Sequence, residues 1–186
     1  TVLDLCAAPG GKTCALLEYQ PDNLELLALD NSNSRLEKVR ENLARLQVQA
    51  TILCGNAQDT ASWWDGKPFD SILLDAPCTG TGVIRRHPDI KLLRHSEDVP
   101  RLASLQRQIL TALWPCLKKG GRMLYSTCSV LKEENTLQIE AFLASTKDAT
   151  IVDITLPGAI PCHAGLQFLP GQNNLDGFYY ALLEKV

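Results

Sequence analysis

The stretch LDLCAAPGGKT, residues 3–13, decides the fold of this chain. It opens with an apolar run of strand length, and Gly10 and Gly11 then lead into a helical pattern. Glycines at such a junction permit a tight turn whose backbone N–H groups lie close to a ligand. The sequence therefore predicts a strand, a binding turn and a helix at the start of the chain.

The same alternation of strand and helix continues to the end of the chain. We expect strands at 1–6, 25–30, 50–54, 69–75, 121–127, 149–154 and 178–184, and helices at 11–20, 34–46, 99–117 and 133–146. Strands alternating with helices are typical of a parallel sheet covered on both faces. The segment 155–177 is rich in Pro, Gly and Asn and is too irregular for a crossover helix. We therefore predict an α/β fold with a seven-stranded, mostly parallel sheet whose last strand is antiparallel.

Composition restricts the class of protein. A length of 186 residues favours a single domain spanning 1–186. A hydrophobic content of 45% with a net charge of only −3 excludes a disordered chain. No apolar run reaches membrane-spanning length, so we expect a soluble, cytoplasmic protein without a membrane partner. The chain begins inside a predicted strand and without Met, which indicates a fragment of a longer polypeptide.

The seven cysteines form no C-x-x-C pair, so neither a bound metal nor a disulfide framework is expected. We interpret five of them as small apolar core residues: Cys6, Cys14, Cys54, Cys116 and Cys162.

The first loop has three interpretations. A phosphate-binding Walker loop would need Gly at position 6, where this chain has Cys6, and the G-x-G-x-x-G dinucleotide motif is absent. The third is a nucleoside ligand held by the loop amides, with its ribose on Asp30 at the end of the next strand and its adenine on Asn56. Asp30 could instead cap the following helix. Because the glycine loop, Asp30 and Asn56 are all present, S-adenosylmethionine is the favoured ligand.

Two of the predicted strands end close to a cysteine. Cys78 follows the strand at 69–75 in Asp75-Ala76-Pro77-Cys78, and Cys128 follows the strand at 121–127. In a doubly wound sheet, functional residues gather at the carboxyl ends of the strands. If the two strands are neighbours, about 4.8 Å apart, both thiols face one pocket.

Two thiols beside a methyl donor suit methylation of a pyrimidine carbon. C5 of cytosine is a poor nucleophile, and a thiolate that adds to C6 converts the ring into an enamine-like species able to take a methyl group. Asp75 is placed to bond the N3/N4 edge of the cytosine. Methylation of an amine would require neither thiol.

These segments together resemble a known family. CAAPGGKT (6–13), DAPC with TGTGVIRRHPDIK (75–91) and YSTCSVLKEEN (125–135) resemble the RNA cytosine-5 methyltransferases, most closely the RsmB/Sun (Fmu) type that acts on bacterial 16S ribosomal RNA. The resemblance covers essentially the whole chain. It implies a Rossmann-like S-adenosylmethionine-dependent methyltransferase fold, with Cys128 as nucleophile and Cys78 assisting product release. DNA cytosine methyltransferases use the Pro-Cys thiol instead, so spacing alone does not assign these roles.

The resemblance also implies which residues bind the methyl donor: Cys6, Ala7, Ala8, Pro9, Gly10, Gly11, Lys12, Asp30, Asn56 and Asp75. Family members often carry Asp where this chain has Asn56, which keeps an acceptor oxygen but loses the charge, so weaker donor affinity is expected.

A basic stretch follows Cys78. Six of the 18 Lys and Arg residues fall between 85 and 107, and we expect Arg85, Arg86, Lys91 and Arg94 to contact RNA phosphates, although a solvated surface is the alternative. The family resemblance implies upstream RNA-binding domains that these 186 residues lack, so low RNA affinity is expected of this fragment.

The sequence leaves two main alternatives to a ribosomal RNA methyltransferase open. The core motifs do not separate a ribosomal RNA substrate from a transfer RNA substrate. A non-catalytic assembly factor that binds donor and RNA would share the fold, although intact Asp75, Cys78 and Cys128 disfavour it. A nucleotide-binding kinase or dehydrogenase is a distant third.

Overall fold

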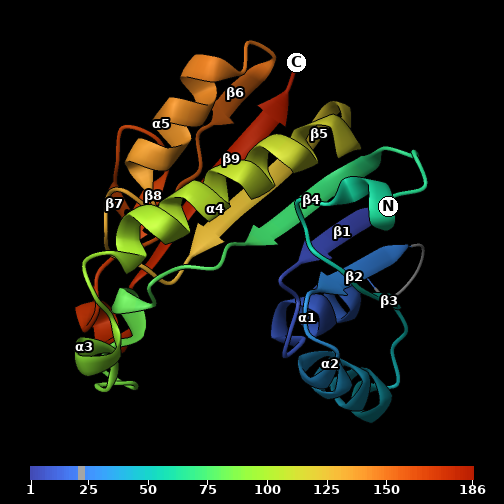
Figure 1. Ribbon diagram of the computed structural model, residues 1–186, viewed down its shortest axis with the longest axis horizontal. Coiled ribbons are helices and arrows are strands. Elements are labelled where there is room, and N and C mark those ends of the chain that lie inside the picture. Colours follow the sequence, from blue (N-terminus) through green and yellow to red (C-terminus); the bar gives the residue numbers. More distant parts are fainter. Residues whose placement is uncertain (21–23) are drawn as a thin grey trace.

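The structure, a computed structural model, describes residues 1–20 and 24–186 (Figure 1). Its described part contains nine strands in one sheet. They are β1 (Val2–Leu5), β2 (Leu26–Asp30), β3 (Thr51–Cys54), β4 (Phe69–Asp75), β5 (Leu117–Thr127), β6 (Ala149–Val152), β7 (Ile160–Pro161), β8 (Leu166–Phe168) and β9 (Phe178–Lys185).

Five α-helices connect or flank these strands in the described residues. They are α1 (Gly11–Tyr19), α2 (Asn33–Leu46), α3 (Ile90–Leu93), α4 (Asp98–Leu113) and α5 (Thr136–Ser145). Short 3₁₀ turns lie at Thr60–Ser62, Thr81–Val83, Trp114–Cys116 and Gln172–Asn174.

The strand order explains where a ligand can bind. The order is β3-β2-β1-β4-β5-β9-β8-β7, with β6 also paired to β9. Strands β1 to β5 are mutually parallel, and β9 runs antiparallel to both β5 and β6. The chain moves outward from β1 to β3 and then crosses back to β4, so the order reverses beside β1. The predicted mostly parallel sheet with a reversed last strand is confirmed.

Two apolar layers hold the sheet between helices. Alternate residues of each strand face opposite sides. Leu3 and Leu5 of β1 belong to the apolar cluster that includes residues of α4 and α5, whereas Ala28 of β2 belongs to the cluster that includes residues of α1 and α2. The helical stripes predicted at 34–46 and 99–117 supply this packing. No helix of the described residues has the length and apolar character to cross a membrane.

Strand β5 starts earlier than predicted, and the preceding helix ends earlier. Helix α4 stops at Leu113, and Pro115 lies in the 3₁₀ turn that follows. Pro has no N–H for a helical hydrogen bond, so the helix does not continue to 117. The pairing partner of Phe69 is Leu117 and that of Ser71 is Arg122, so β5 carries several extra residues in a bulge.

The irregular segment 155–177 also contains structure that the sequence did not reveal. Strands β7 and β8 pair as a short antiparallel hairpin, and β8 extends the sheet beyond β9, so the sheet holds two more strands than the seven predicted. These strands have two and three residues, too few to show a period-two pattern. Helix α3 was not predicted either, because its four residues are too few to show a helical repeat. Helix α5 begins at Thr136 rather than at residue 133.

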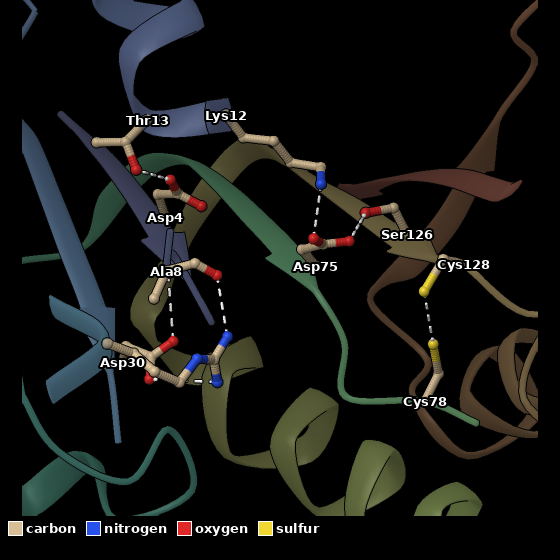
Figure 2. A network of polar contacts seen from close by, with 10 residues as sticks. Asp4, Ala8, Lys12, Thr13, Asp30, Asp75, Cys78, Ser126 and Cys128 are labelled. Atoms are coloured by element: carbon tan, nitrogen blue, oxygen red, sulfur yellow. Dashed lines mark hydrogen bonds and ion pairs between the residues drawn. The ribbon is translucent and has the colours of Figure 1, made fainter. Parts of the chain in front are cut away.

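A buried carboxyl group joins β1 to α1. Asp4 is fully buried, and its Oδ2 accepts a hydrogen bond of 2.5 Å from the Thr13 hydroxyl (Figure 2). Its Oδ1 has no hydrogen-bond partner among the described residues. Burial raises the pKa of Asp4 to about 6.

We predict a pH-dependent gain of stability from Asp4→Asn. The folded protein holds the Asp4 proton more tightly than the unfolded chain, so losing that proton between about pH 4 and about pH 6 destabilises the wild type. Asn is uncharged and still accepts from Thr13. Thermal unfolding across this range should show Asp4→Asn gaining up to about 3 kcal/mol over the wild type, with the gain retained above pH 6. A difference in stability that does not vary with pH would contradict this assignment.

Candidate active site

The first loop turns sharply between β1 and α1. Cys6 has φ 57°, Gly10 has φ 99°, and the Gly10 amide donates to the Ala7 carbonyl oxygen over 2.7 Å. A Cβ on Gly10 would lie 3.2 Å from Val39 of α2, so both conformation and packing require glycine there. Gly11 begins α1 with open space around it, so the turn depends on Gly10.

Asp30 ends β2, as predicted, and holds this loop. Its carboxylate is buried at 2% exposure and accepts hydrogen bonds from the Ala8 amide (3.2 Å) and the Ser32 amide (3.1 Å). Ser32 is the N-cap of α2, so Asp30 is not the capping residue. Arg35 lies 3.6 Å from Asp30 and donates to the Ala8 carbonyl oxygen over 2.9 Å.

A cavity of about 330 Å³ lies at the carboxyl ends of the central strands. It brings together residues that the sequence analysis had selected from segments far apart in the chain. Those on its wall are Cys6, Ala8, Asp30, Asn56, Asp75, Cys78 and Cys128. The volume falls within the range of small-molecule sites.

Other predicted donor-binding residues support the wall without lining it. Ala7, Pro9, Gly10, Gly11 and Lys12 are not among the lining residues. Conversely, the cavity is also lined by residues that were not predicted from the sequence, among them Asn31, Gln58, Leu105 and Ile109. Asn31 adjoins Asp30, which could have drawn attention to it. Leu105 and Ile109 belong to the apolar stripe of α4 that was interpreted as core, and they form the apolar side of the cavity.

Hydrogen bonds connect the start of α1, just after the first loop, to the carboxyl ends of β4 and β5. Lys12 Nζ donates to Asp75 Oδ2 over 2.6 Å, and Ser126 Oγ donates to Asp75 Oδ1 over 2.9 Å (Figure 2). Burial lowers the pKa of Lys12, but the charge and hydrogen bond of Asp75 outweigh it and leave this pKa above its usual value. Asp75 is thus fixed between α1 and β5 at the rim of the cavity.

The two thiols meet because β4 and β5 are neighbours. Asp75 pairs with Ser126 in the parallel register, and each strand end then leads into a turn that carries one cysteine. Cys78 Sγ lies 3.4 Å from Cys128 Sγ, and both are half-buried (Figure 2). The two side chains therefore meet, as predicted.

The environments of the two thiols differ. The hydrogen bond between them, together with burial and the nearby Glu134 carboxylate, raises the pKa of Cys78 well above its usual range. The same hydrogen bond lowers the pKa of Cys128, and the Lys12 charge acts in the same direction. Cys128 is therefore the sulfur of the pair that loses its proton more readily.

The interpretation of the other five cysteines as core residues holds for only two. Cys14 and Cys116 are buried, but Cys54 is exposed and Cys6 and Cys162 are half-buried. Cys54 ends β3, which lies at the edge of the described sheet and pairs on one side only, with β2. No cluster of three or more metal-ligating side chains occurs in residues 1–20 and 24–186.

The four predicted phosphate-contacting residues lie on the surface after the Cys78 turn. Three already have partners: Arg85 donates to the Leu175 carbonyl oxygen, Arg86 pairs with Asp176, and Arg94 Nε donates to the Thr79 carbonyl oxygen over 2.8 Å. The side chain of Lys91 makes no hydrogen bond or ion pair within the described residues, and only its backbone N–H donates, to the Pro88 carbonyl oxygen. Through its bond to Thr79, the residue after Cys78, Arg94 helps to hold the Cys78 turn.

Comparison with known proteins places this geometry in context. The chain is 53% identical over 184 residues to "Ribosomal RNA small subunit methyltransferase B" of Vibrio cholerae serotype O1, covering 99% of this chain and 41% of that protein. It is 54% identical to the protein of the same name from Pseudomonas putida, covering 100% and 42%. The chain thus spans less than half the length of these relatives.

Solved structures show the same fold. The structure titled "Crystal Structure of PH0851" superimposes with a TM-score of 0.94 at 33% identity, covering 99% of this chain and 42% of that one. NSun6 from Pyrococcus horikoshii with SFG gives a TM-score of 0.87 at 30% identity, covering 100% and 48%. The family model described as 16S rRNA methyltransferase RsmB/F matches residues 1–184, and this chain belongs to that family.

Proposed function

We propose that the protein containing this chain methylates C5 of a cytosine in 16S ribosomal RNA, with S-adenosylmethionine as methyl donor and a covalent bond to Cys128 during the reaction. The observation that carries this proposal is the meeting of Cys78 and Cys128 on the wall of the cavity that also includes the first loop and Asp30. The relatives named as ribosomal RNA methyltransferases support the substrate class.

The residues of the cavity fit S-adenosylmethionine. The buried Asp30 carboxylate suits a ribose diol, and the apolar side chains of Leu105 and Ile109 suit the face of an adenine. Asn56 is exposed at the rim, where its amide is able to bond the adenine edge. When bound, S-adenosylmethionine supplies the sulfonium methyl group that C5 of the cytosine takes.

The chain's own residues divide the rest of the chemistry. The Cys128 thiolate bonds to C6, and the electron pair of the C5–C6 double bond makes C5 nucleophilic. After methylation a base takes the C5 proton, the C–H electron pair restores the C5–C6 double bond, and the bond between sulfur and C6 breaks with its electron pair returning to Cys128 as thiolate. Cys78, which keeps its proton more tightly, assists this release. Asp75, fixed by Lys12 and Ser126, lies where it can orient the cytosine edge.

The RNA phosphates would contact the surface formed by Arg85, Arg86 and Lys91 beside the Cys78 turn. Because Arg86 pairs with Asp176, its contact with RNA requires exchange of that partner. These few cations account for positioning of the strand and do not select a sequence. Low RNA affinity therefore remains our expectation for residues 1–186 alone.

Trapping with RNA that contains 5-fluorocytosine tests the roles of the two thiols in the intact protein. Fluorine at C5 blocks the release step, so a stable protein–RNA adduct should accumulate with wild type and with Cys78→Ser. Cys128→Ser should reduce adduct yield by roughly 100-fold or more, because no nucleophile remains. Cys54→Ser, which alters an exposed thiol away from the cavity, is the matched control and should behave as wild type. Loss of the adduct in Cys78→Ser with retention in Cys128→Ser would reverse the assignment.

Deleting the gene tests the proposed substrate in cells. Mass spectrometry of digested 16S ribosomal RNA and transfer RNA should reveal the loss of one 5-methylcytosine from 16S ribosomal RNA, restored by wild type but not by Cys128→Ser. A loss confined to transfer RNA would favour the transfer RNA alternative. If every methyl group persists, the protein is a non-catalytic assembly factor and our proposal fails.

A further inference from the structure

Two adjacent residues outside the cavity contact both cysteine-bearing turns. Glu134 and Asn135 lie immediately before α5 and are buried at 0% and 2% exposure. Neither lines the cavity. A buried carboxylate is costly unless it receives several hydrogen bonds, so the bonds that these side chains make are informative about their role.

Glu134 holds the turn that carries Cys78. Its Oε1 accepts from the Thr79 amide over 2.9 Å, and its Oε2 accepts from the Thr79 hydroxyl over 2.6 Å. Gln106 Nε2 donates both to Glu134 Oε1 (3.1 Å) and to the Pro77 carbonyl oxygen (2.9 Å). The residues on each side of Cys78 are therefore fixed by one buried network. The Tyr125 hydroxyl also donates to the Glu134 carbonyl oxygen over 2.6 Å.

Asn135 holds the turn that carries Cys128. Its Oδ1 accepts from the Thr127 hydroxyl over 2.6 Å, and its Nδ2 donates to the Ser129 carbonyl oxygen over 2.9 Å. The same Nδ2 donates to Gln167 Oε1 of β8 over 2.8 Å. The residues on each side of Cys128 are thus bonded to one amide group. On the Cys78 side, the Glu134 carboxylate bonds Thr79 directly and is linked to Pro77 through Gln106.

We propose that Glu134 and Asn135 are a pair of positioning residues that fix the separation and orientation of the Cys78 and Cys128 sulfur atoms. Because the two residues are joined by a single peptide bond, a shift of either cysteine turn strains the contacts of the other. The geometric part of this inference stands on the contacts alone. Its catalytic part rests on the proposed function.

Loss of Glu134 and loss of Asn135 should affect different steps of the reaction. Without Glu134 the Cys78 turn loses both bonds from Thr79 to the carboxylate and is then held by its contacts with Gln106 and Arg94. The Cys128 turn keeps Asn135, so the adduct should form but be released slowly. Without Asn135 the nucleophile itself is displaced, so the adduct should not form. A general structural role would impair both steps and donor binding equally.

Oxidation of the two thiols measures their geometry without reference to the reaction on RNA. The intact, reduced protein is treated with diamide, which takes two hydrogens as the Cys78–Cys128 disulfide forms, and peptide mass spectrometry follows the rate. Glu134→Ala and Asn135→Ala should each slow this step at least about tenfold, since displacements near 1 Å have large effects on reacting pairs. Glu133→Ala, at the neighbouring exposed residue, is the matched control and should leave the rate unchanged.

Two further variants keep the test decisive if Glu134→Ala does not fold. Glu134→Gln retains one acceptor oxygen for the Thr79 amide and should stay within about threefold of the wild-type rate. Thr79→Val removes the hydroxyl bonded to Glu134, together with its longer contacts to Thr81 and Ser129, and should slow disulfide formation by about threefold. Calorimetry with S-adenosylmethionine should give a wild-type affinity for all of these variants.

The 5-fluorocytosine RNA and an ordinary cytosine RNA then test the catalytic part. Glu134→Ala should accumulate adduct even on ordinary RNA, whereas Asn135→Ala should form none on either. Disulfide rates in both alanine variants within twofold of Glu133→Ala would overturn the inference, as would identical adduct behaviour of the two. If wild type forms no adduct at all while the disulfide rates still depend on both residues, the proposed function fails and the positioning role stands.

Discussion

The parallel pairing of β4 with β5 is the constraint on which the site depends. It places Asp75 opposite Ser126, and the chain leaves both strands at the same edge of the sheet. Neighbouring strands are about 4.8 Å apart, so the two turns that follow begin side by side. Two thiols separated by 50 positions in the sequence thereby come within 3.4 Å of each other. Without this register, neither the thiol pair nor its cavity would exist.

The hydrogen bond between the two thiols gives the sulfur atoms different properties, because it raises the pKa of Cys78 and lowers that of Cys128. The Glu134 carboxylate adds to the rise of the pKa at Cys78. Lys12 lies in the first turn of α1, directly after the first loop, and its ion pair with Asp75 links α1 to the end of β4. Asp75 also accepts from Ser126, two residues before Cys128, so one set of hydrogen bonds connects α1, β4 and β5 beside the thiols (Figure 2).

Much of this arrangement follows from the sequence, because apolar periodicity and turn chemistry are local signals. The strand from residue 26 ends at Asp30 as predicted, and the two cysteine turns follow neighbouring strands. The β7–β8 hairpin escaped prediction because its strands are too short to show a pattern. Glu134 and Asn135 also escaped, because their importance lies in contacts with residues such as Thr79, far away in the chain.

Leu105 illustrates a second limit of sequence reasoning. Its helical spacing indicates a core position, and it packs against the core, yet it also lines the cavity. A periodic pattern identifies the inward face of a helix but not which part of that face borders a cavity. Similarly, the basic run after Cys78 predicted surface cations, but only the structure shows that Arg94 is bonded to the Thr79 carbonyl oxygen.

A crystal structure of the intact protein with S-adenosylhomocysteine bound tests the central claim most directly. Our account predicts the ribose on the Asp30 carboxylate, the adenine against Leu105 and Ile109, and the ligand sulfur facing the space beside Cys78 and Cys128. A ligand bound elsewhere, or thiols that point away from its sulfur, would contradict the account.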